Sequence, residues 1–500
     1  MTRLKRLDWY CWLLLGVTTN TWAQAPVIQA PTQYSAEAGT YFSSSERTPF
    51  WLRSNQYGIV PLKSPVATLR AGVYSDYDSS RLASRRLAIG YGLNVVANAG
   101  ASRQLLLPEA YVKARLGPFE FYAGRRREIF GLVDSTLSSG SYAWSGNALP
   151  IPKVQFGIPQ FTPIGFTKGW VSVMGQYAHG WFSGTGYVQN AFLHQKTAYV
   201  RLGRPQDVVR LFGGMNHQAV WGGYSEDLVG TGLVTSANLP SSLRDYWYTV
   251  TAKRGTRPDT SLYTQFDITN RVGNHLGTVD AGIEIDLTRV TLFAYRQNIY
   301  EDGSLFYLTN IADGLNGLRI RRNNPDALVR EVLIEFLNTT SQGGPEFVID
   351  DDKRRGKDDY FNNAQFRDGW SYQCQGIGTP FIPPALGPNG ECPYGGFTLN
   401  NRVQVWHLGL QGSLPLELER WLAGRIQYQT KLSYSNNLGT YNAPYPQPRR
   451  QFSAWLNLVV PFRSGFNLTS SLAADSGELY TNSVGVYVGI RKTWLTAANR

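Results

Sequence analysis

Apolar and polar side chains alternate along two neighbouring stretches of the chain, residues 278–287 and 290–297. In the first stretch, the apolar side chains are separated by Asp280, Glu284 and Asp286. Successive side chains of a β-strand point to opposite faces, so this stretch predicts a strand with one apolar face and one acidic face. A turn at 288–289 reverses the chain into a second alternating stretch. Together they predict a β-hairpin whose apolar face covers either a protein core or lipid.

Similar alternation recurs along most of the chain and predicts about 18 to 20 strands in all, a number typical of large outer-membrane barrels. Besides the hairpin, the candidate strands are 67–77, 87–99, 105–116, 119–126, 153–161, 170–183, 197–202, 208–217, 246–253, 261–270, 315–321, 328–337, 403–412, 425–435, 452–460, 466–475 and 483–494.

The connections between these candidate strands alternate between short and long through the C-terminal two-thirds of the chain. The short ones are 203–205, 288–289, 322–327, 413–422 and 462–464, and the long ones are 220–245, 300–314, 338–400 and 436–451. Bacterial barrels have short periplasmic turns and long external loops, whereas a sandwich has no reason to alternate in this way. The pattern therefore predicts an all-β fold, a transmembrane antiparallel β-barrel of about 18 strands with long external loops over residues 67–500.

Composition agrees with a barrel that spans a membrane by strands. The chain has 500 residues, of which 13% are aromatic and 51 are glycine, and its mean hydropathy is -0.27. Beyond the N-terminus, no apolar run approaches the roughly 20 residues that a membrane helix needs. A membrane protein without such helices must be a closed barrel, because only closure satisfies every backbone group in lipid.

The N-terminus predicts export. Arg3, Lys5 and Arg6 precede a short apolar stretch at 9–17, which is typical of a signal peptide, here residues 1–23; the alternative is an anchor that is retained. Residues 24–66 then predict a periplasmic or plug-like segment. We expect the mature chain in the bacterial outer membrane, in contact with outer-membrane lipids. Export excludes nucleic acid as a partner in spite of the formal net charge of +12.

Several segments, taken in order, resemble the Wzi-type capsule assembly proteins. They include Pro49-Phe50-Trp51-Leu52, Gly124-Arg125-Arg126, 138–140, 145–152, His275-Leu276-Gly277 with Asp280, 300–302, 313–315, Tyr360-Phe361-Asn362-Asn363, Gly369-Trp370-Ser371-Tyr372 and 377–381. The resemblance implies an outer-membrane barrel of 18 strands that acts as a lectin, not an enzyme. Some members have an N-terminal helical bundle at the periplasmic end. The stretch before Ala67 is short and interrupted by proline here, so we expect that bundle to be reduced or absent.

The loop 338–400 carries candidate polysaccharide-binding residues, namely Tyr360, Asn362, Asn363, Trp370 and Tyr372. Sugar rings stack on aromatic faces, and amides hydrogen-bond to hydroxyl groups. The alternative for the aromatic side chains is packing that fixes the loop in the barrel mouth.

Four arginines are further candidates for binding an acidic polysaccharide: Arg125, Arg126, Arg319 and Arg321. The guanidinium group pairs with carboxylates through two hydrogen bonds. The alternative, which we favour, is pairing inside the barrel with carboxylates such as Glu284 and Asp286.

Cysteine and histidine usage predicts no cofactor and no metal site. Cys374 and Cys392 lie in one loop and are expected to form a disulfide in an oxidising compartment. The five histidines, His179, His194, His217, His275 and His407, are scattered singly, without a spacing that suggests metal ligands.

These observations predict a lectin-like barrel that assists the surface attachment or assembly of capsular or exopolysaccharide. Its expected partners are this polysaccharide and, less directly, the polysaccharide export machinery. The alternative is an outer-membrane porin, anion-selective in view of the net charge of +12. A weaker alternative is a barrel hydrolase, which would need a nucleophile and a base that converge across strands.

Overall fold

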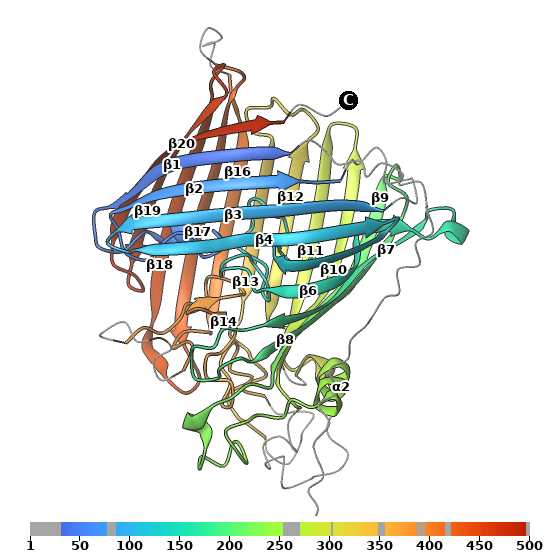
Figure 1. Cartoon of the computed structure of the whole chain (residues 1–500), viewed down its shortest axis with the longest axis vertical. Coiled ribbons are helices and arrows are strands. Elements are labelled where there is room, and N and C mark those ends of the chain that lie inside the picture. Colours follow the sequence, from blue (N-terminus) through green and yellow to red (C-terminus); the bar gives the residue numbers. More distant parts are fainter. Residues whose placement is uncertain are drawn as a thin grey trace, which may run out of the picture.

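The computed structural model describes residues 32–77, 87–253, 271–301, 304–348, 356–387, 392, 396–415 and 422–496. Its main feature is one antiparallel sheet of 18 strands that closes on itself, because β1 pairs with both β2 and β20 (Figure 1). The predicted all-β barrel is therefore confirmed, as is the count of 18 strands.

The strands of the barrel follow one another around the wall in chain order. They are β1 (Gln33–Ser43), β2 (Val66–Ser75), β3 (Ala88–Gly100), β4 (Gln104–Leu116), β5 (Phe119–Arg125), β6 (Lys153–Pro163), β7 (Val171–Trp181), β8 (Phe192–Leu202), β9 (Val209–Trp221), β10 (Asn274–Leu287), β11 (Val290–Glu301), β12 (Gly314–Arg322), β13 (Glu331–Asn338), β16 (Val403–Leu414), β17 (Ile426–Gly439), β18 (Pro444–Pro461), β19 (Phe466–Gly477) and β20 (Ser483–Leu495).

Short elements lie in the connections. They are the helices α1 (Phe50–Arg53) and α2 (Leu243–Thr251), the 3₁₀ turns η2 (Gly165–Thr167), η3 (Glu226–Leu228) and η4 (Ser304–Tyr307), and the two-residue strands β14 (Ser371–Tyr372) and β15 (Gln375–Gly376). Among the described residues, no helix is long and apolar enough to cross a membrane.

The apolar face of the strands points outward. On β10, Val279 is 43% exposed whereas the neighbouring Asp280 is 2% exposed, and Ile283 pairs with Ala294 of β11 on the same outer face. Large apolar side chains are exposed in the same way all round the barrel, for example Leu69, Val112, Phe156, Val200, Ile334, Leu456 and Val488. Exposed apolar rows outside and buried polar rows inside are the arrangement of a transmembrane barrel.

Connection lengths sort the two ends of the barrel. The turns at 117–118, 288–289 and 462–465 lie at one end, and the connections 44–65, 126–152, 222–273 and 339–402 lie at the other. We call these the periplasmic end and the external end, following the rule for bacterial barrels. Figure 1 shows several of the long connections, with α2, gathered below the sheet. The predicted alternation of short and long connections is confirmed for the long connections within 222–273, 302–313 and 339–402. The long connection expected at 436–451 is wrong, because β17 continues to Gly439 and β18 begins at Pro444, so that only residues 440–443 join the two paired strands.

The barrel begins earlier than residue 67, the predicted boundary, because Gln33–Ser43 forms β1. Its outward face carries the small side chains of Ala36 and Ala38, so its hydrophobic alternation is weak. The strand is held from inside instead, where Glu37 accepts a hydrogen bond from Arg70 at 3.0 Å and Tyr41 accepts another at 2.6 Å. The segment predicted at 24–66 therefore contains a barrel strand, and the connection 44–65 that follows it, which includes α1, lies at the external end.

The predicted strand at 246–253 is wrong, since Leu243–Thr251 forms the helix α2. A capping box starts this helix: Ser242 and Asp245 each bond to the backbone N–H of the other. Such reciprocal bonds satisfy two donors that are otherwise left free at a helix start, and they override the strand propensity of Tyr246, Trp247 and Tyr248. The candidate strand at 261–270 lies outside the described residues.

Candidate functional site

The connection 126–152 folds into the barrel and is held there by carboxylates of the wall. Glu335 on β13 accepts hydrogen bonds from Ser138 Oγ at 2.7 Å, from the backbone N–H of Ser139 at 2.6 Å, and from the hydroxyl of Tyr295. Asp280 on β10 accepts a bond from the backbone N–H of Leu132 at 2.9 Å. Bonds to ionised acceptors are the strong ones, so the acidic inner face holds a plug made of residues 126–152.

The long connection 339–402 joins this plug. Glu301 accepts a hydrogen bond from the hydroxyl of Tyr142 at 2.7 Å and another from the backbone N–H of Phe361 at 3.2 Å. Trp51 of α1 completes the filling of the lumen, and its indole N–H donates to Ser433 Oγ at 3.1 Å. Tyr142, Phe361 and Trp51 belong to one cluster of buried apolar side chains in the interior, and Leu52 of α1 belongs to a second, smaller cluster. The lumen is thus packed with protein and is not lined only by strands.

Of the four candidate arginines, three form ion pairs inside the barrel, as the favoured alternative predicts. Arg319 pairs with Glu284 at 3.0 Å and with Asp134 at 3.5 Å. Arg321 pairs with Glu331. Arg126 pairs with Glu120 at 2.6 Å and with Glu128 at 2.7 Å.

Glu128, in the plug, illustrates how strongly these charges act. Burial alone would raise the pKa of its carboxyl group, but the neighbouring Lys153 and Arg126 outweigh burial and lower the pKa to about 2. The Nζ atom of Lys153 lies 2.8 Å from the carboxylate. Glu128 is therefore ionised at neutral pH and ties the start of the plug to the wall.

Most of the candidate residues of the loop 338–400 build the loop itself. Trp370 is fully buried, and its indole N–H donates to the carbonyl oxygen of Ala143 at 2.6 Å. The hydroxyl of buried Tyr360 donates to Asp313 at 2.9 Å. Asn362 donates to the carbonyl oxygen of Thr398 at 3.0 Å, and the Oδ1 of Asn363 accepts from two backbone N–H groups at 2.9 Å.

Tyr372 lies at a cavity of about 230 Å³ between the connection 182–191 and the loop that follows Phe366. We call this cavity the mouth pocket, because both connections belong to the external end. Its lining includes Phe182, Ser183, Thr185, Asp368, Ser371, Tyr372 and Gln373. Cys374 and Cys392, which form a disulfide, also line it. The fourth candidate arginine, Arg125, donates to the hydroxyl of Tyr372 at 2.8 Å.

Asp368 fixes the two walls of the mouth pocket against each other. Its carboxylate accepts bonds from the backbone N–H groups of Tyr187 at 3.1 Å and Val188 at 2.8 Å. Burial raises the pKa of this carboxyl group, and the two N–H groups partly oppose the rise. The ring of Phe182 meets Tyr372 edge to face at 6.1 Å between centroids. The pocket therefore combines aromatic, hydroxyl and amide groups on a braced frame.

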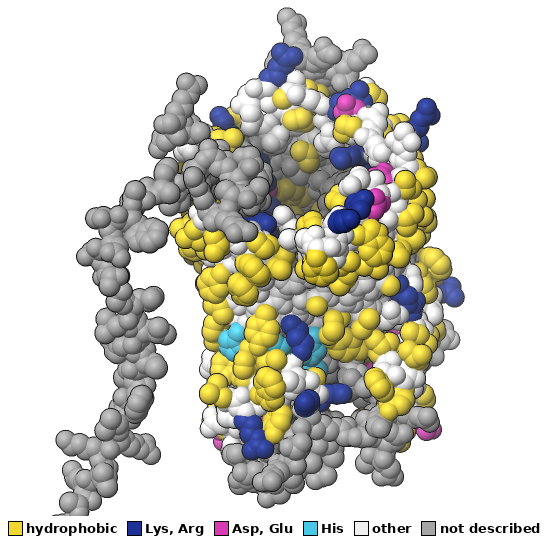
Figure 2. Space-filling model, turned by 90° about the vertical axis from the view of Figure 1, so that its right-hand side faces the viewer, with side chains coloured by type: hydrophobic (Ala, Val, Ile, Leu, Met, Phe, Trp, Pro, Cys, Tyr) yellow, Lys and Arg dark blue, Asp and Glu magenta, His cyan; other side chains and the backbone are white. Residues whose placement is uncertain are grey.

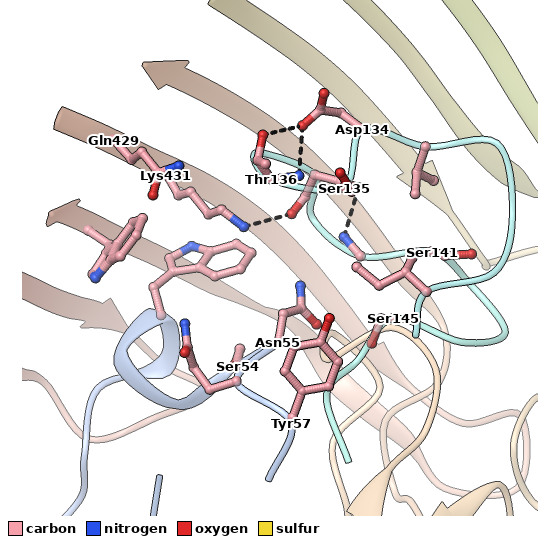
Figure 3. A pocket seen from close by; sticks show the side chains of 17 residues that line it. Ser54, Asn55, Tyr57, Asp134, Ser135, Thr136, Ser141, Ser145, Gln429 and Lys431 are labelled. Carbon is pink, nitrogen blue, oxygen red and sulfur yellow. Dashed lines mark hydrogen bonds between the residues drawn. The ribbon is translucent and has the colours of Figure 1, made fainter. Parts of the chain in front are cut away.

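A second cavity, of about 140 Å³, lies in the lumen (Figure 3). Its lining includes Trp51, Asn55, Tyr57, Asp134, Gln429 and Lys431. Lys431 Nζ donates to the carbonyl oxygen of Ser138 at 2.9 Å and lies 4.8 Å from the centre of the Trp51 ring. The lysine is thus engaged by the plug. This cavity could not be predicted from the sequence, because its residues come from α1 and the segment after it, from the plug and from β17.

The histidines are not scattered in space. His179, His194, His217 and His275 come from four adjacent strands, and the Nε2 atom of His217 lies 2.9 Å from Nδ1 of His275. The prediction from spacing alone missed this, because strand pairing brings together residues far apart in sequence. Among the residues that the structure describes, no group of three or more His, Cys, Asp or Glu side chains is arranged to hold a metal ion.

Comparisons with known proteins point in one direction. A family model described as "Capsule assembly protein Wzi" matches residues 31–381. Wzi of Escherichia coli, described as an outer-membrane protein of group 1 capsule assembly and a carbohydrate-binding β-barrel, is similar in structure, with a TM-score of 0.57 and 14% identity over 91% of this chain and 83% of that one. At this identity the likeness shows the barrel fold alone.

Two further solved structures resemble the chain less. OccK3 of Pseudomonas aeruginosa has a TM-score of 0.45 and 9% identity over 93% of this chain and 96% of that one. An anion-selective porin from Comamonas acidovorans has a TM-score of 0.38 and 9% identity over 93% of this chain and 98% of that one. A search of curated proteins gave no match.

Proposed function

The chain belongs to the Wzi capsule assembly family, whose model matches residues 31–381, and from this premise we propose that it binds capsular or exopolysaccharide and assists its attachment or assembly at the cell surface. The protein is a β-barrel of the bacterial outer membrane. The family match is the observation that carries the proposal. It agrees with the carbohydrate binding described for the structurally similar Wzi of Escherichia coli.

The mouth pocket is the site that we propose for the polysaccharide. It lies at the external end, where surface polysaccharide would meet the barrel, and aromatic faces with hydroxyl and amide groups are the side chains that bind sugar rings. Its volume of about 230 Å³ is below the roughly 300–1,000 Å³ of ordinary small-molecule pockets. We therefore propose that it takes one sugar unit of the chain, with Phe182 at the ring and Gln373 and Ser183 at its hydroxyl groups.

We favour a protein that binds polysaccharide without cleaving it. Glycoside hydrolysis commonly uses two carboxylates that flank the bond to be cleaved. Among the residues that line the mouth pocket, Asp368 is the one carboxylate, and two backbone N–H groups already occupy it. This supports a lectin over a hydrolase. We expect the export machinery to be the source of the polysaccharide rather than a ligand of this pocket.

The porin alternative is disfavoured by the plug. An open channel needs a continuous water-filled lumen, whereas here Glu335, Asp280 and Glu301 each bond to segments folded inside the barrel. Planar-bilayer recording separates the two functions: silence is expected for the binding protein, and a steady open conductance would favour the porin.

A pair of phenylalanine variants tests the proposed site. Surface polysaccharide from the source bacterium is immobilised, and binding of the full chain in detergent is measured. Phe182→Ala removes the proposed ring contact and should weaken binding about tenfold, because a lost aromatic contact of about 1.4 kcal/mol corresponds to that factor. Phe306→Ala is the matched control, since Phe306 is an exposed external phenylalanine outside the pocket lining. Equal binding by both variants would reject the mouth pocket, and no binding by the unmodified chain would reject the function.

A further inference from the structure

The outer wall of β7 to β10 turns polar toward the external end. Val209, Leu211 and Met215 are exposed along the outer face of β9, but the next large side chain of that row is His217, which pairs with Lys196 of β8. His194 of β8 pairs with His179 of β7, and both side chains lie on the outward face of the wall. Both ring nitrogens of buried His194 lack a hydrogen-bond partner within the described chain. A polar row on a lipid-facing wall is unfavourable, by about 2–4 kcal/mol for a lysine at the midplane and less near the interface.

The helix α2 covers this polar row from outside the barrel. The hydroxyl of Tyr246 lies 2.6 Å from the hydroxyl of Tyr177. The ring of Tyr246 lies 5.2 Å from that of Trp221 and 5.9 Å from that of His194. Lys196 reaches the helix as well, and its Nζ donates to the carbonyl oxygen of Val250. Figure 2 shows histidines on this outer wall, bordered by basic and hydrophobic side chains.

Both ends of α2 are fixed. The capping box of Ser242 and Asp245 closes its start, where the N–H of Ser242 donates to Asp245 at 2.7 Å. At its end, Arg271 Nε donates to the carbonyl oxygen of Ala252 at 2.8 Å, close to the bond from Lys196. Cations at a helix C-terminus complement its dipole. The helix is therefore a defined element of the wall.

The face of α2 that points away from the barrel is apolar. Leu243 is 89% exposed and Trp247 is 60% exposed, one helical turn apart, whereas Asp245, Tyr248 and Thr249 are buried. Arg244 is exposed next to this stripe, with its Nε donating to the hydroxyl of Tyr248 at 3.0 Å, and Lys253 is exposed just after the end of the helix. A helix with a tryptophan and a leucine exposed on one face is typical of elements that lie in a membrane interface.

The position of α2 along the barrel axis agrees with the interface between the membrane and the external water. A tilted strand crosses the hydrocarbon with about 9–11 residues. Counted from the periplasmic end of β9 at Val209, this length places His217 at the outer rim of the membrane. The stripe of Leu243 and Trp247 thus continues the lipid-facing apolar belt outward to the level of the headgroups.

We propose that α2 is an interfacial helix that shields the histidine row and binds the phosphorylated glycolipid of the outer leaflet. Acyl chains contact Leu243 and Trp247, and phosphate groups contact Arg244 and Lys253. Two observations select this occupant: the apolar stripe is continuous with the lipid-facing belt, and the flanking charges are complementary to phosphate. The proposal does not depend on polysaccharide binding.

Spin labelling tests where the helix lies. The full chain carries Cys11→Ser and either Trp247→Cys or, as control, Ser236→Cys, which is an exposed position of the same connection. Each is labelled with a nitroxide and reconstituted in vesicles that contain phosphorylated lipid A. The label at 247 should relax faster with membrane-soluble oxygen than with a water-soluble nickel complex, and the label at 236 should show the opposite. The same water-facing behaviour at both positions would overturn the proposal.

Lipid binding tests the headgroup assignment. Binding of the full chain to lipid A is compared with binding to dephosphorylated lipid A and to phosphatidylglycerol. The unmodified chain should prefer phosphorylated lipid A about tenfold, and Arg244→Gln with Lys253→Gln should abolish the preference. Arg425→Gln at the periplasmic end is the control and should retain it. Equal binding of all three lipids, or an unaffected double variant, would overturn the assignment.

Discussion

Substitution of Glu335 by glutamine tests whether wall carboxylates hold the plug. Glu335 is buried on the inner face of β13. Its two carboxylate oxygens accept from Ser138 Oγ at 2.7 Å and from the backbone N–H of Ser139 at 2.6 Å, and the hydroxyl of Tyr295 donates to the same group. A glutamine of nearly the same shape has one acceptor oxygen, so Glu335→Gln leaves at least one plug donor without its partner.

The size of the effect follows from the number and kind of bonds. A hydrogen bond to a charged group contributes about 1.5–3 kcal/mol and a neutral one about 0.5–1.5 kcal/mol. Losing one charged bond and neutralising another therefore costs the plug about 2–4 kcal/mol. Since each 1.4 kcal/mol is a factor of about ten, the locally opened population should rise by roughly 30-fold to 1,000-fold. The barrel wall itself, paired strand to strand, should be unaffected.

Amide hydrogen exchange of the purified protein in detergent measures this opening directly. Peptides that cover the plug should exchange faster in Glu335→Gln, while peptides from β17 to β19 should not change. Asp326→Asn is the matched control, because Asp326 is an exposed carboxylate whose contact with Arg425 is 3.9 Å long and contributes little. Plug exchange in Glu335→Gln within twofold of the unmodified chain would refute the account of the plug.

Three further predictions concern the same interior and the mouth. The pKa of Glu128 is lowered to about 2 from an unfolded value near 4.5, so the stability that it gives the plug is present above pH 4.5 and is lost as the pH falls toward 2; plug exchange should accelerate over that range, and less so in Glu128→Gln. Trp51→Ala leaves a cavity beside Ser433 and should destabilise the connection 44–65 by about 3–5 kcal/mol; unchanged exchange there would contradict its packing role. Reduction of the Cys374–Cys392 disulfide should weaken polysaccharide binding and increase protease cleavage of the loop without lowering the melting temperature of the barrel; intact binding after complete reduction would show that the disulfide does not support the mouth pocket.

The strands of the barrel wall could be predicted because the alternation of apolar and polar residues is a local property of the sequence. Val279 and Asp280 alternate on β10 according to the period of a strand, and the structure places the first outside and the second inside. The signal fails where the outward face carries small side chains, as at Ala36 and Ala38 of β1. It also fails where apolar and aromatic residues belong to a helix, as in α2, because Tyr246 and Trp247 favour a strand by propensity and the capping box decides otherwise.

The interior was not predictable in the same way. Trp370 is buried through a hydrogen bond to the carbonyl oxygen of Ala143, which is 227 positions away in the chain. The residue type alone therefore could not decide whether Trp370 packs inside the protein or contacts sugar. The mouth pocket likewise needs Phe182 from one connection and Tyr372 from another. Tyr372 could be singled out because it belongs to a segment that resembles the Wzi-type proteins. Nothing in the sequence marks Phe182 as a candidate binding residue.

The most direct test of the account is the amount of polysaccharide that stays on the cell. The gene is deleted in the source bacterium and restored with the unmodified chain or with Phe182→Ala, and cell-bound and released polysaccharide are measured separately. The account predicts that deletion lowers the cell-bound fraction while total synthesis is maintained, and that Phe182→Ala restores attachment only in part. An unchanged cell-bound fraction in the deletion strain would contradict it.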